Sequence, residues 1–230
     1  GLLIIEDAAQ GMMSTYKNRP LGSFGHLAAV SFHETKNVIS GEGGALLIND
    51  TKYIERAEII WEKGTNRCQF FRGQADKYTW MDIGSSYLLS EINAAFLWAQ
   101  LEEAESITRK RLRIWEMYHE AFGRLEEKSK VRRPVIPPQC KHNAHMYYLL
   151  LPDLEKRNAL LDKLQVNGIN AIFHYVPLHS SPGGKKHGRA HGDLSHTRNA
   201  SDRLIRLPLW VEMTEDDVQL VVEAVYKNLD

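Results

Sequence analysis

The stretch Ser31-Phe32-His33-Glu34-Thr35-Lys36-Asn37, soon followed by Gly41-Glu42-Gly43-Gly44, contains the residues that decide the fold. The apolar run that precedes it is typical of a buried strand, and the glycines after it are typical of a tight turn. We therefore expect Lys36 to be a buried amine with a chemical role. The ordinary alternative is a solvated lysine, because most lysines lie at the protein surface.

A carboxylate follows a second apolar run. Leu2-Leu3-Ile4-Ile5 leads into Glu6-Asp7-Ala8-Ala9-Gln10, which predicts a buried parallel strand with Asp7 at its carboxyl end, where open α/β sheets bind their ligands. A lysine and a carboxylate facing one ligand suit pyridoxal phosphate, which needs a Schiff-base lysine and an anion near its ring nitrogen. Ser31 is then expected to bind or support the cofactor phosphate. The alternative role for Asp7 is a turn or helix cap.

These motifs resemble the signatures of the sugar-nucleotide aminotransferases of the DegT/StrS type, which are fold-type I pyridoxal-phosphate enzymes. The similarity covers essentially the whole chain, continuing through Lys63-Gly64-Thr65-Asn66-Arg67, Phe173-His174-Tyr175-Val176-Pro177-Leu178-His179 and Arg206-Leu207-Pro208-Leu209. It implies an α/β fold, made of the C-terminal part of an aspartate-aminotransferase-like large domain and a small α+β domain. It also implies that Lys36 is the catalytic residue and that the cofactor is bound by Asp7, Ala8, Gln10, Ser31 and Lys36.

One motif departs from the family pattern. Most members carry Gly-x-Asn-x-Arg where this chain has Gly84-Ser85-Ser86-Tyr87-Leu88. This stretch resembles the subgroup that makes dTDP-4-amino-4,6-dideoxygalactose for enterobacterial common antigen, a cell-envelope polysaccharide. The resemblance implies transamination of a dTDP-4-keto-6-deoxy-hexose with L-glutamate, giving the 4-amino sugar, with the galactose configuration, and 2-oxoglutarate. A sugar dehydratase using the same cofactor would carry histidine in place of the lysine, and Lys36 argues against that activity.

Polar rings gather in the second half of the chain. His174 and Tyr175 lie on a predicted strand and His179 in the turn after it, with Pro177 fixing the backbone between them. We expect them to contact the nucleotide sugar, His179 above all. The alternative is that His174 and Tyr175 are half-buried and bonded to backbone groups.

A histidine-rich stretch raises the question of a metal. His187 and His191 have the i, i+4 spacing of zinc ligands, with His196 nearby. The surrounding glycines, Gly183, Gly184, Gly188 and Gly192, disfavour a helix, and no cysteine or firm carboxylate accompanies the histidines. We therefore predict no metal.

Composition restricts the class of protein. Lys plus Arg equals Asp plus Glu at 29 each, which gives no electrostatic reason to expect nucleic acid or a membrane as partner. Two cysteines, Cys68 and Cys140, indicate a reducing, cytoplasmic setting. The resemblance implies a homodimer. It also leads us to expect that the chain lacks the N-terminal part of such an enzyme, with weak activity by itself; a non-catalytic nucleotide-sugar or partner-binding remnant is the alternative.

Pattern and turn chemistry predict two domains, residues 1–133 and 134–230, separated near Pro134, Pro137 and Pro138. We expect strands at 2–7, 27–32, 45–49, 145–151 and 170–176. Helices are expected at 52–63, from 88 to about 127 with a bend, at 154–166 and from Thr214 onward, and long loops at 64–83 and 180–196.

Overall fold

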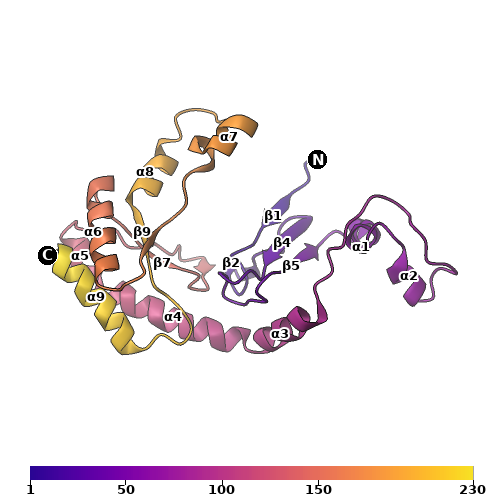
Figure 1. The fold of residues 1–230 in the computed structure, drawn as a ribbon, viewed down its shortest axis with the longest axis horizontal. Coiled ribbons are helices and arrows are strands. Elements are labelled where there is room, and N and C mark those ends of the chain that lie inside the picture. Colours follow the sequence, from indigo (N-terminus) through magenta and orange to yellow (C-terminus); the bar gives the residue numbers. More distant parts are fainter. Residues whose placement is uncertain (230) are drawn as a thin grey trace. The chain divides into compact units, whose positions relative to one another are not determined.

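The computed structural model describes residues 1–229, and the chain forms two compact units (Figure 1). The first unit contains Gly1–Ile107 and Pro138–Asn143, and the second contains Thr108–Pro137 and Ala144–Asp230. This division lies within a helix and differs from the domain ranges 1–133 and 134–230, which stay a prediction. The segment Pro138–Asn143 belongs to the first unit, so the chain passes back from the second unit to the first at this point. The positions of the prolines alone do not indicate this.

The first unit is built on a three-stranded sheet with the order β1-β4-β5. The strands are β1 (Ile5–Asp7), β4 (Leu27–Ser31) and β5 (Gly44–Ile48). β1 runs parallel to β4, and β5 runs antiparallel to it. The three strands predicted here are confirmed in position, although β1 is shorter than the predicted strand 2–7. The expected burial of the first strand is wrong, because the apolar side chains of residues 2–5 are all exposed. β1 and β4 therefore end at the same edge of the sheet.

A second small sheet joins distant parts of the chain. It has the order β3-β2-β6, with β2 (Thr15–Tyr16), β3 (Arg19–Pro20) and β6 (Cys140–Lys141). Lys17 and Asn18 connect β2 to β3 with positive φ angles of 49° and 62°, as a two-residue hairpin turn requires. The sequence reading missed this sheet because its strands have two residues each and no periodic pattern.

Helices follow the main sheet of this unit. The 3-10 turn η1 (Thr51–Tyr53) begins after Asp50, whose carboxylate accepts from the Lys52 N–H at 3.2 Å, and continues into α1 (Ile54–Trp61). The predicted loop 64–83 contains a short helix, α2 (Arg67–Phe71), which corrects that expectation. The helical stretch predicted from residue 88 is confirmed as α3 (Glu91–Glu102), α4 (Ala104–Ala121) and α5 (Gly123–Glu127).

Two glycines, Gly64 and Gly84, lie where the two ends of the segment 64–83 meet. Gly64 has a φ of +78°, and a Cβ placed on it would lie 1.8 Å from the Asp82 carbonyl oxygen. A Cβ on Gly84 would lie 2.2 Å from the Gly64 nitrogen. Only glycine at both positions lets the two ends of the loop approach this closely.

The second unit packs helices on an antiparallel sheet of order β7-β9-β8. Its strands are β7 (Tyr147–Leu150), β8 (Ile172–Phe173) and β9 (Leu204–Leu207), and its longest helices besides α4 are α6 (Leu154–Val166) and α9 (Glu215–Leu229). α6 has the bounds expected from the sequence, and Asp153 caps it by accepting from the Lys156 N–H at 2.8 Å. The core is rich in aromatic rings, including those of Trp115, Tyr118, Phe122 and Tyr147.

The predicted loop 180–196 is corrected by the structure. After the 3-10 turn η2 (Leu178–Ser180), a helix α7 (Pro182–His187) forms despite its glycines, and α8 (Ser195–Arg203) begins within the same stretch. Ser181 caps α7 by accepting from the Gly184 N–H at 3.0 Å, and Pro182 occupies the first turn, where its missing N–H costs nothing. Within residues 1–229, no helix is both long enough and apolar enough to cross a membrane.

Candidate cofactor site

Asp7 ends β1 and begins a tight turn. In the parallel ladder Asp7 lies opposite Ala29, and the Ala8 N–H donates to the Ala29 carbonyl at 2.9 Å. One carboxylate oxygen of Asp7 accepts from the Ala9 N–H at 3.1 Å. The side chain is otherwise exposed, and Ala8 beneath it is buried. Asp7 thus caps a turn and also presents a charge at the sheet edge.

Lys36 lies in the connection between β4 and β5. Phe32 extends the pairing beyond β4 by donating its N–H to the Gly43 carbonyl at 2.9 Å. The Lys36 N–H then closes a turn on the His33 carbonyl at 2.9 Å. The Lys36 side chain is half-buried, and within residues 1–229 its amine has no hydrogen-bond or ion-pair partner. The position of this lysine is therefore set by the hydrogen-bonded backbone of its turn.

Ser31 is the last residue of β4 and points its hydroxyl into the same turn. Its Oγ accepts from the His33 N–H at 3.3 Å. The His33 ring lies 2.9 Å from the Thr35 hydroxyl through Nδ1, and 3.7 Å from Glu42 Oε1 through Nε2. These contacts hold the turn that carries Lys36.

Gln10 lies in the turn after Asp7, and its side chain is exposed. Its backbone carbonyl accepts from the side-chain amide of Asn143, which sequence reasoning did not single out. No motif around residue 143 signals this contact, because it joins residues 133 positions apart.

Glu6 is a second residue that the sequence reading missed. It points to the opposite side of β1 from Asp7, as alternation along a strand requires. Its carboxylate accepts from the backbone N–H groups of Gly22 (2.9 Å), Phe24 and Gly25 (2.8 Å). Burial acts to raise the pKa of Glu6, but these three donors outweigh it, so the pKa lies below its ordinary value. This carboxylate holds the loop before β4.

The chemistry of this sheet edge fits pyridoxal phosphate. A half-buried unpaired amine, an exposed carboxylate and a hydroxyl follow the carboxyl ends of two paired parallel strands. The carboxylate suits a protonated ring nitrogen, the amine suits an aldehyde, and the hydroxyl suits a phosphate oxygen.

The predicted sugar contacts all lie in the second unit. His174 is half-buried, and its ring centroid is 4.9 Å from that of Tyr175. Its Nδ1 is buried, and among residues 1–229 this atom has no hydrogen-bond partner. Burial, aided by the positive charge of Arg206, lowers the pKa of His174, because both disfavour the protonated ring. Tyr175 is exposed, and His179 lies half-buried in η2.

Tyr175 also lines a groove of about 440 Å³ between α6, α8 and the end of β8. Positively charged and aromatic groups share this groove, since the Arg157 guanidinium lies 5.6 Å from the Phe173 ring centroid. His174 and His179 are not among its lining residues. The structure therefore places one of the three predicted contacts in the groove.

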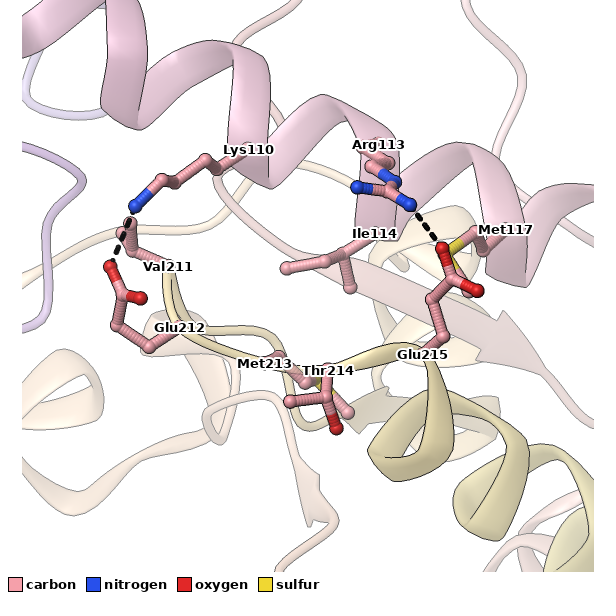
Figure 2. Close-up of a pocket in the computed structure, with 9 residues that line it drawn as sticks. All are labelled: Lys110, Arg113, Ile114, Met117, Val211, Glu212, Met213, Thr214 and Glu215. Carbon is pink, nitrogen blue, oxygen red and sulfur yellow. Dashed lines mark hydrogen bonds and ion pairs between the residues drawn. The ribbon is translucent and has the colours of Figure 1, made fainter.

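A different hollow of about 330 Å³ lies between α4 and the segment before α9 (Figure 2). Lys110 pairs with Glu212 at 2.8 Å across it, and Arg113 pairs with Glu215. Both ion pairs are exposed, and none of the predicted site residues lines this hollow. Its charges already satisfy one another, so it offers little to a ligand.

Within residues 1–229, no three histidine, cysteine or acidic side chains lie close enough together to hold a metal ion. His187 ends α7 and His191 lies in the segment between α7 and α8, so the i, i+4 pair does not lie on one continuous helix.

The sequence matches the DegT/DnrJ/EryC1/StrS aminotransferase family over residues 1–226. The chain belongs to this family. Its aminotransferases use pyridoxal phosphate, in agreement with the chemistry of the sheet edge.

Two curated relatives and one solved structure illustrate the similarity. An uncharacterized protein, MJ1066, from Methanocaldococcus jannaschii is 32% identical over 98% of this chain and 60% of its own length. The spore coat polysaccharide biosynthesis protein SpsC of Bacillus subtilis is 28% identical over 98% of this chain and 59% of its own. A putative sugar aminotransferase, Spr1654 from Streptococcus pneumoniae in its PLP form, shares the fold with a TM-score of 0.83, at 24% identity over 99% of this chain and 59% of that chain. The chain thus spans about three fifths of the curated relatives it matches.

Proposed function

We propose that the protein transfers an amino group from L-glutamate to a dTDP-4-keto-6-deoxy-hexose. The product is the dTDP-4-amino-4,6-dideoxy-hexose, in the galactose configuration, with 2-oxoglutarate as the second product. The observation that carries the proposal is the placement of Asp7 and Lys36 after the paired ends of β1 and β4. Family membership supports the reaction type, and the Gly84-Ser85-Ser86-Tyr87-Leu88 motif supports the sugar.

Bound pyridoxal phosphate supplies an aldehyde that captures amines and a ring that accepts electrons. In our proposal Lys36 Nζ holds the cofactor through its aldehyde carbon and, once released, carries the proton between substrate and cofactor. Asp7 would keep the ring nitrogen charged, as a close opposite charge does. Gln10 would hold the ring hydroxyl, Ser31 would bind the phosphate, and Ala8 would complete the residues that hold the cofactor.

Chemical trapping tests the assignment of Lys36. The protein is incubated with pyridoxal phosphate, reduced with borohydride, digested and mapped by mass spectrometry. We expect the pyridoxyl label on the peptide containing Lys36, and its loss in Lys36→Arg, because a guanidinium does not capture the aldehyde. Lys63→Arg is the matched control, since Lys63 lies outside the proposed site, and it should keep the label. A label spread over surface lysines, unchanged in Lys36→Arg, would overturn the assignment.

Product analysis tests the sugar. The protein is supplied with dTDP-4-keto-6-deoxyglucose and glutamate, and the amino sugar is identified by mass and by proton coupling constants. A 4-amino product with the galactose configuration supports the proposal. Binding of the nucleotide sugar without any label at Lys36 would favour a non-catalytic binding module instead.

His174, Tyr175 and His179 are our proposed contacts to the nucleotide sugar. The buried Nδ1 of His174, which has no partner within residues 1–229, supports this role, as does the exposed ring of Tyr175. His179→Ala should raise KM for the sugar nucleotide while leaving the label at Lys36 intact. Leu178→Ala is the control, because Leu178 lies in the same turn and is 82% exposed. An unchanged KM in His179→Ala would remove that residue from the site.

A homodimer in the cytoplasm is the proposed assembly. Exposed aromatic side chains on the loop between Gly64 and Gly84 support a partner surface there, because Phe71 is 70% and Trp80 74% exposed. Light scattering across assay concentrations tests the assembly. An active monomer would contradict it.

A further inference from the structure

The side chain of Asn143 spans the turn that follows Asp7. Its amide nitrogen donates to the Gln10 carbonyl at 2.8 Å and to the Met12 carbonyl at 2.7 Å. Asn143 is only 5% exposed. One buried amide therefore fixes two carbonyl groups of the same turn, and with them the path of the backbone that leaves Asp7.

The backbone of the same residue holds the lysine turn. The Asn143 carbonyl accepts from the side-chain amide of Asn37 at 2.7 Å, and Asn37 is 8% exposed. Asn37 directly follows Lys36. Asn143 thus contacts both turns of the candidate site, through its side chain on one and its carbonyl on the other.

Asn143 is itself anchored from outside those turns. It follows β6, whose Lys141 and Cys140 pair with Thr15 and Tyr16 of β2. A change in either turn therefore requires movement against a paired strand. The position of Asn143 is therefore set by the pairing of β6 with β2, and not by the Asp7 turn or the Lys36 turn that it contacts.

We propose that Asn143 is a positioning residue that sets the separation of the Asp7 and Lys36 turns, so that carboxylate and amine meet one rigid ring. The inference rests on the proposed function, because the ring is that of pyridoxal phosphate. A planar cofactor that is held at both its ring nitrogen and its aldehyde carbon requires the two holding groups to lie at a set separation. A displacement of a reacting group by about 1 Å costs roughly a hundredfold in rate. Alanine has no side-chain donor and aspartate has only acceptor oxygens when ionised, so neither reproduces this pair of bonds.

Two variants of Asn143 and one control test the role. Asn143→Ala removes both donors, and Asn143→Asp keeps the shape but sets a carboxylate oxygen against two carbonyl oxygens. The control is Asn49→Ala, because the Asn49 amide also donates to two backbone carbonyls, those of Gly22 (2.8 Å) and Gly25 (3.0 Å). Asn49 braces a loop of the same unit that carries none of the proposed site residues.

The readouts are taken well below each variant's melting temperature, in the protein that carries this chain. They are the rate of pyridoxyl labelling at Lys36, the induced circular dichroism per bound cofactor, and hydrogen exchange at residues 8–12 and 33–40. We expect labelling at least tenfold slower and weaker dichroism in Asn143→Asp, an intermediate effect in Asn143→Ala, and faster exchange in both turns. Asn49→Ala should match the wild type in all three, even if it melts at a lower temperature.

Asn37→Ala tests the same role of Asn143 with a smaller change, because it removes one hydrogen bond to the Asn143 carbonyl and leaves Asn143 itself intact. It removes the bond to the lysine turn and leaves the Asn143 amide on the Asp7 turn. Exchange should then rise at 33–40 alone, with slower labelling. Wild-type labelling and dichroism in all three variants at positions 37 and 143 would overturn the inference. Failure of the wild type to be labelled at Lys36 would instead overturn the proposed function, and exchange would still show whether Asn143 couples the two turns.

Discussion

The N–H of Ala8 donates to the carbonyl of Ala29 at 2.9 Å. This bond carries the parallel pairing of β1 and β4 one residue beyond Asp7. It fixes where the chain leaves β1 relative to β4. Beyond Ala29, β4 continues only through Val30 and Ser31 before it also ends. The proposed carboxylate and the turn with the proposed amine are therefore placed by a backbone ladder and not by flexible loops.

Asp7→Asn separates the two roles of this side chain. The asparagine oxygen can still accept from the Ala9 N–H, so the turn and the melting temperature should be retained. Loss of the charge should lower the fraction of cofactor with a protonated ring nitrogen by roughly ten- to a thousandfold, and turnover with it. Steady-state kinetics with a cofactor titration measure both quantities. Unchanged turnover would show that Asp7 only caps the turn.

Glu6→Gln should change how stability depends on pH. The Glu6 pKa is lowered in the folded state, so its carboxylate stabilises the fold above the unfolded pKa of about 4.3, and this stability is lost as pH falls through the folded pKa. The variant should be less stable at pH 7 by about 1–3 kcal/mol, because its amide group faces backbone donors. Urea unfolding between pH 3 and pH 7 should show a shallower acid decline in the variant. Parallel curves would contradict the role assigned to Glu6.

Gly64→Ala should destabilise the closed loop. The added Cβ meets the Asp82 carbonyl oxygen at 1.8 Å, so backbone must move. Gly73→Ala is the matched control, because Gly73 has a similar φ of +70° with no atom within 4 Å of the added Cβ. Positive φ alone costs about 1–2 kcal/mol, and the clash should add about 1–3 kcal/mol at Gly64. Thermal melts and proteolysis of the loop compare the two; equal losses would rule out the close approach.

Leu164→Ala tests the core of the second unit. Leu164 is fully buried on α6, so its truncation leaves a cavity and should cost about 2–5 kcal/mol in the free energy of unfolding. Leu178→Ala removes the same atoms from a site that is 82% exposed and should cost less than about 0.5 kcal/mol. Denaturant unfolding of both variants gives the comparison. A small loss at Leu164 would mean that α6 does not belong to this core.

The sequence indicated strongly patterned elements and missed those that tertiary contacts create. The bounds of α6 agree with the prediction, in which Asn167-Gly168 ends the helix, and the structure adds Asp153 as the cap at its start. The two-residue strand β6 has no local signal, since it exists only by pairing with β2, more than 120 residues earlier in the chain. In the same way Lys36 and Asp7 are recognisable from motifs, whereas Asn143 acquires its role only when β6 returns to the first unit.

The position of residues 138–143, which belong to the first unit but follow part of the second in the sequence, has a consequence for biosynthesis. β6 and Asn143 are made after α4 and α5, so the first unit is completed by residues that leave the ribosome behind part of the second. Pairing Tyr16 with Cys140 closes a very long loop, which costs conformational entropy. This pairing can form only after both residues have been synthesised. On a nascent chain that has not reached residue 138, the turns of Asp7 and Lys36 are present but unbraced. Competence to hold the cofactor would therefore arise late in synthesis, well after its lysine and carboxylate have emerged.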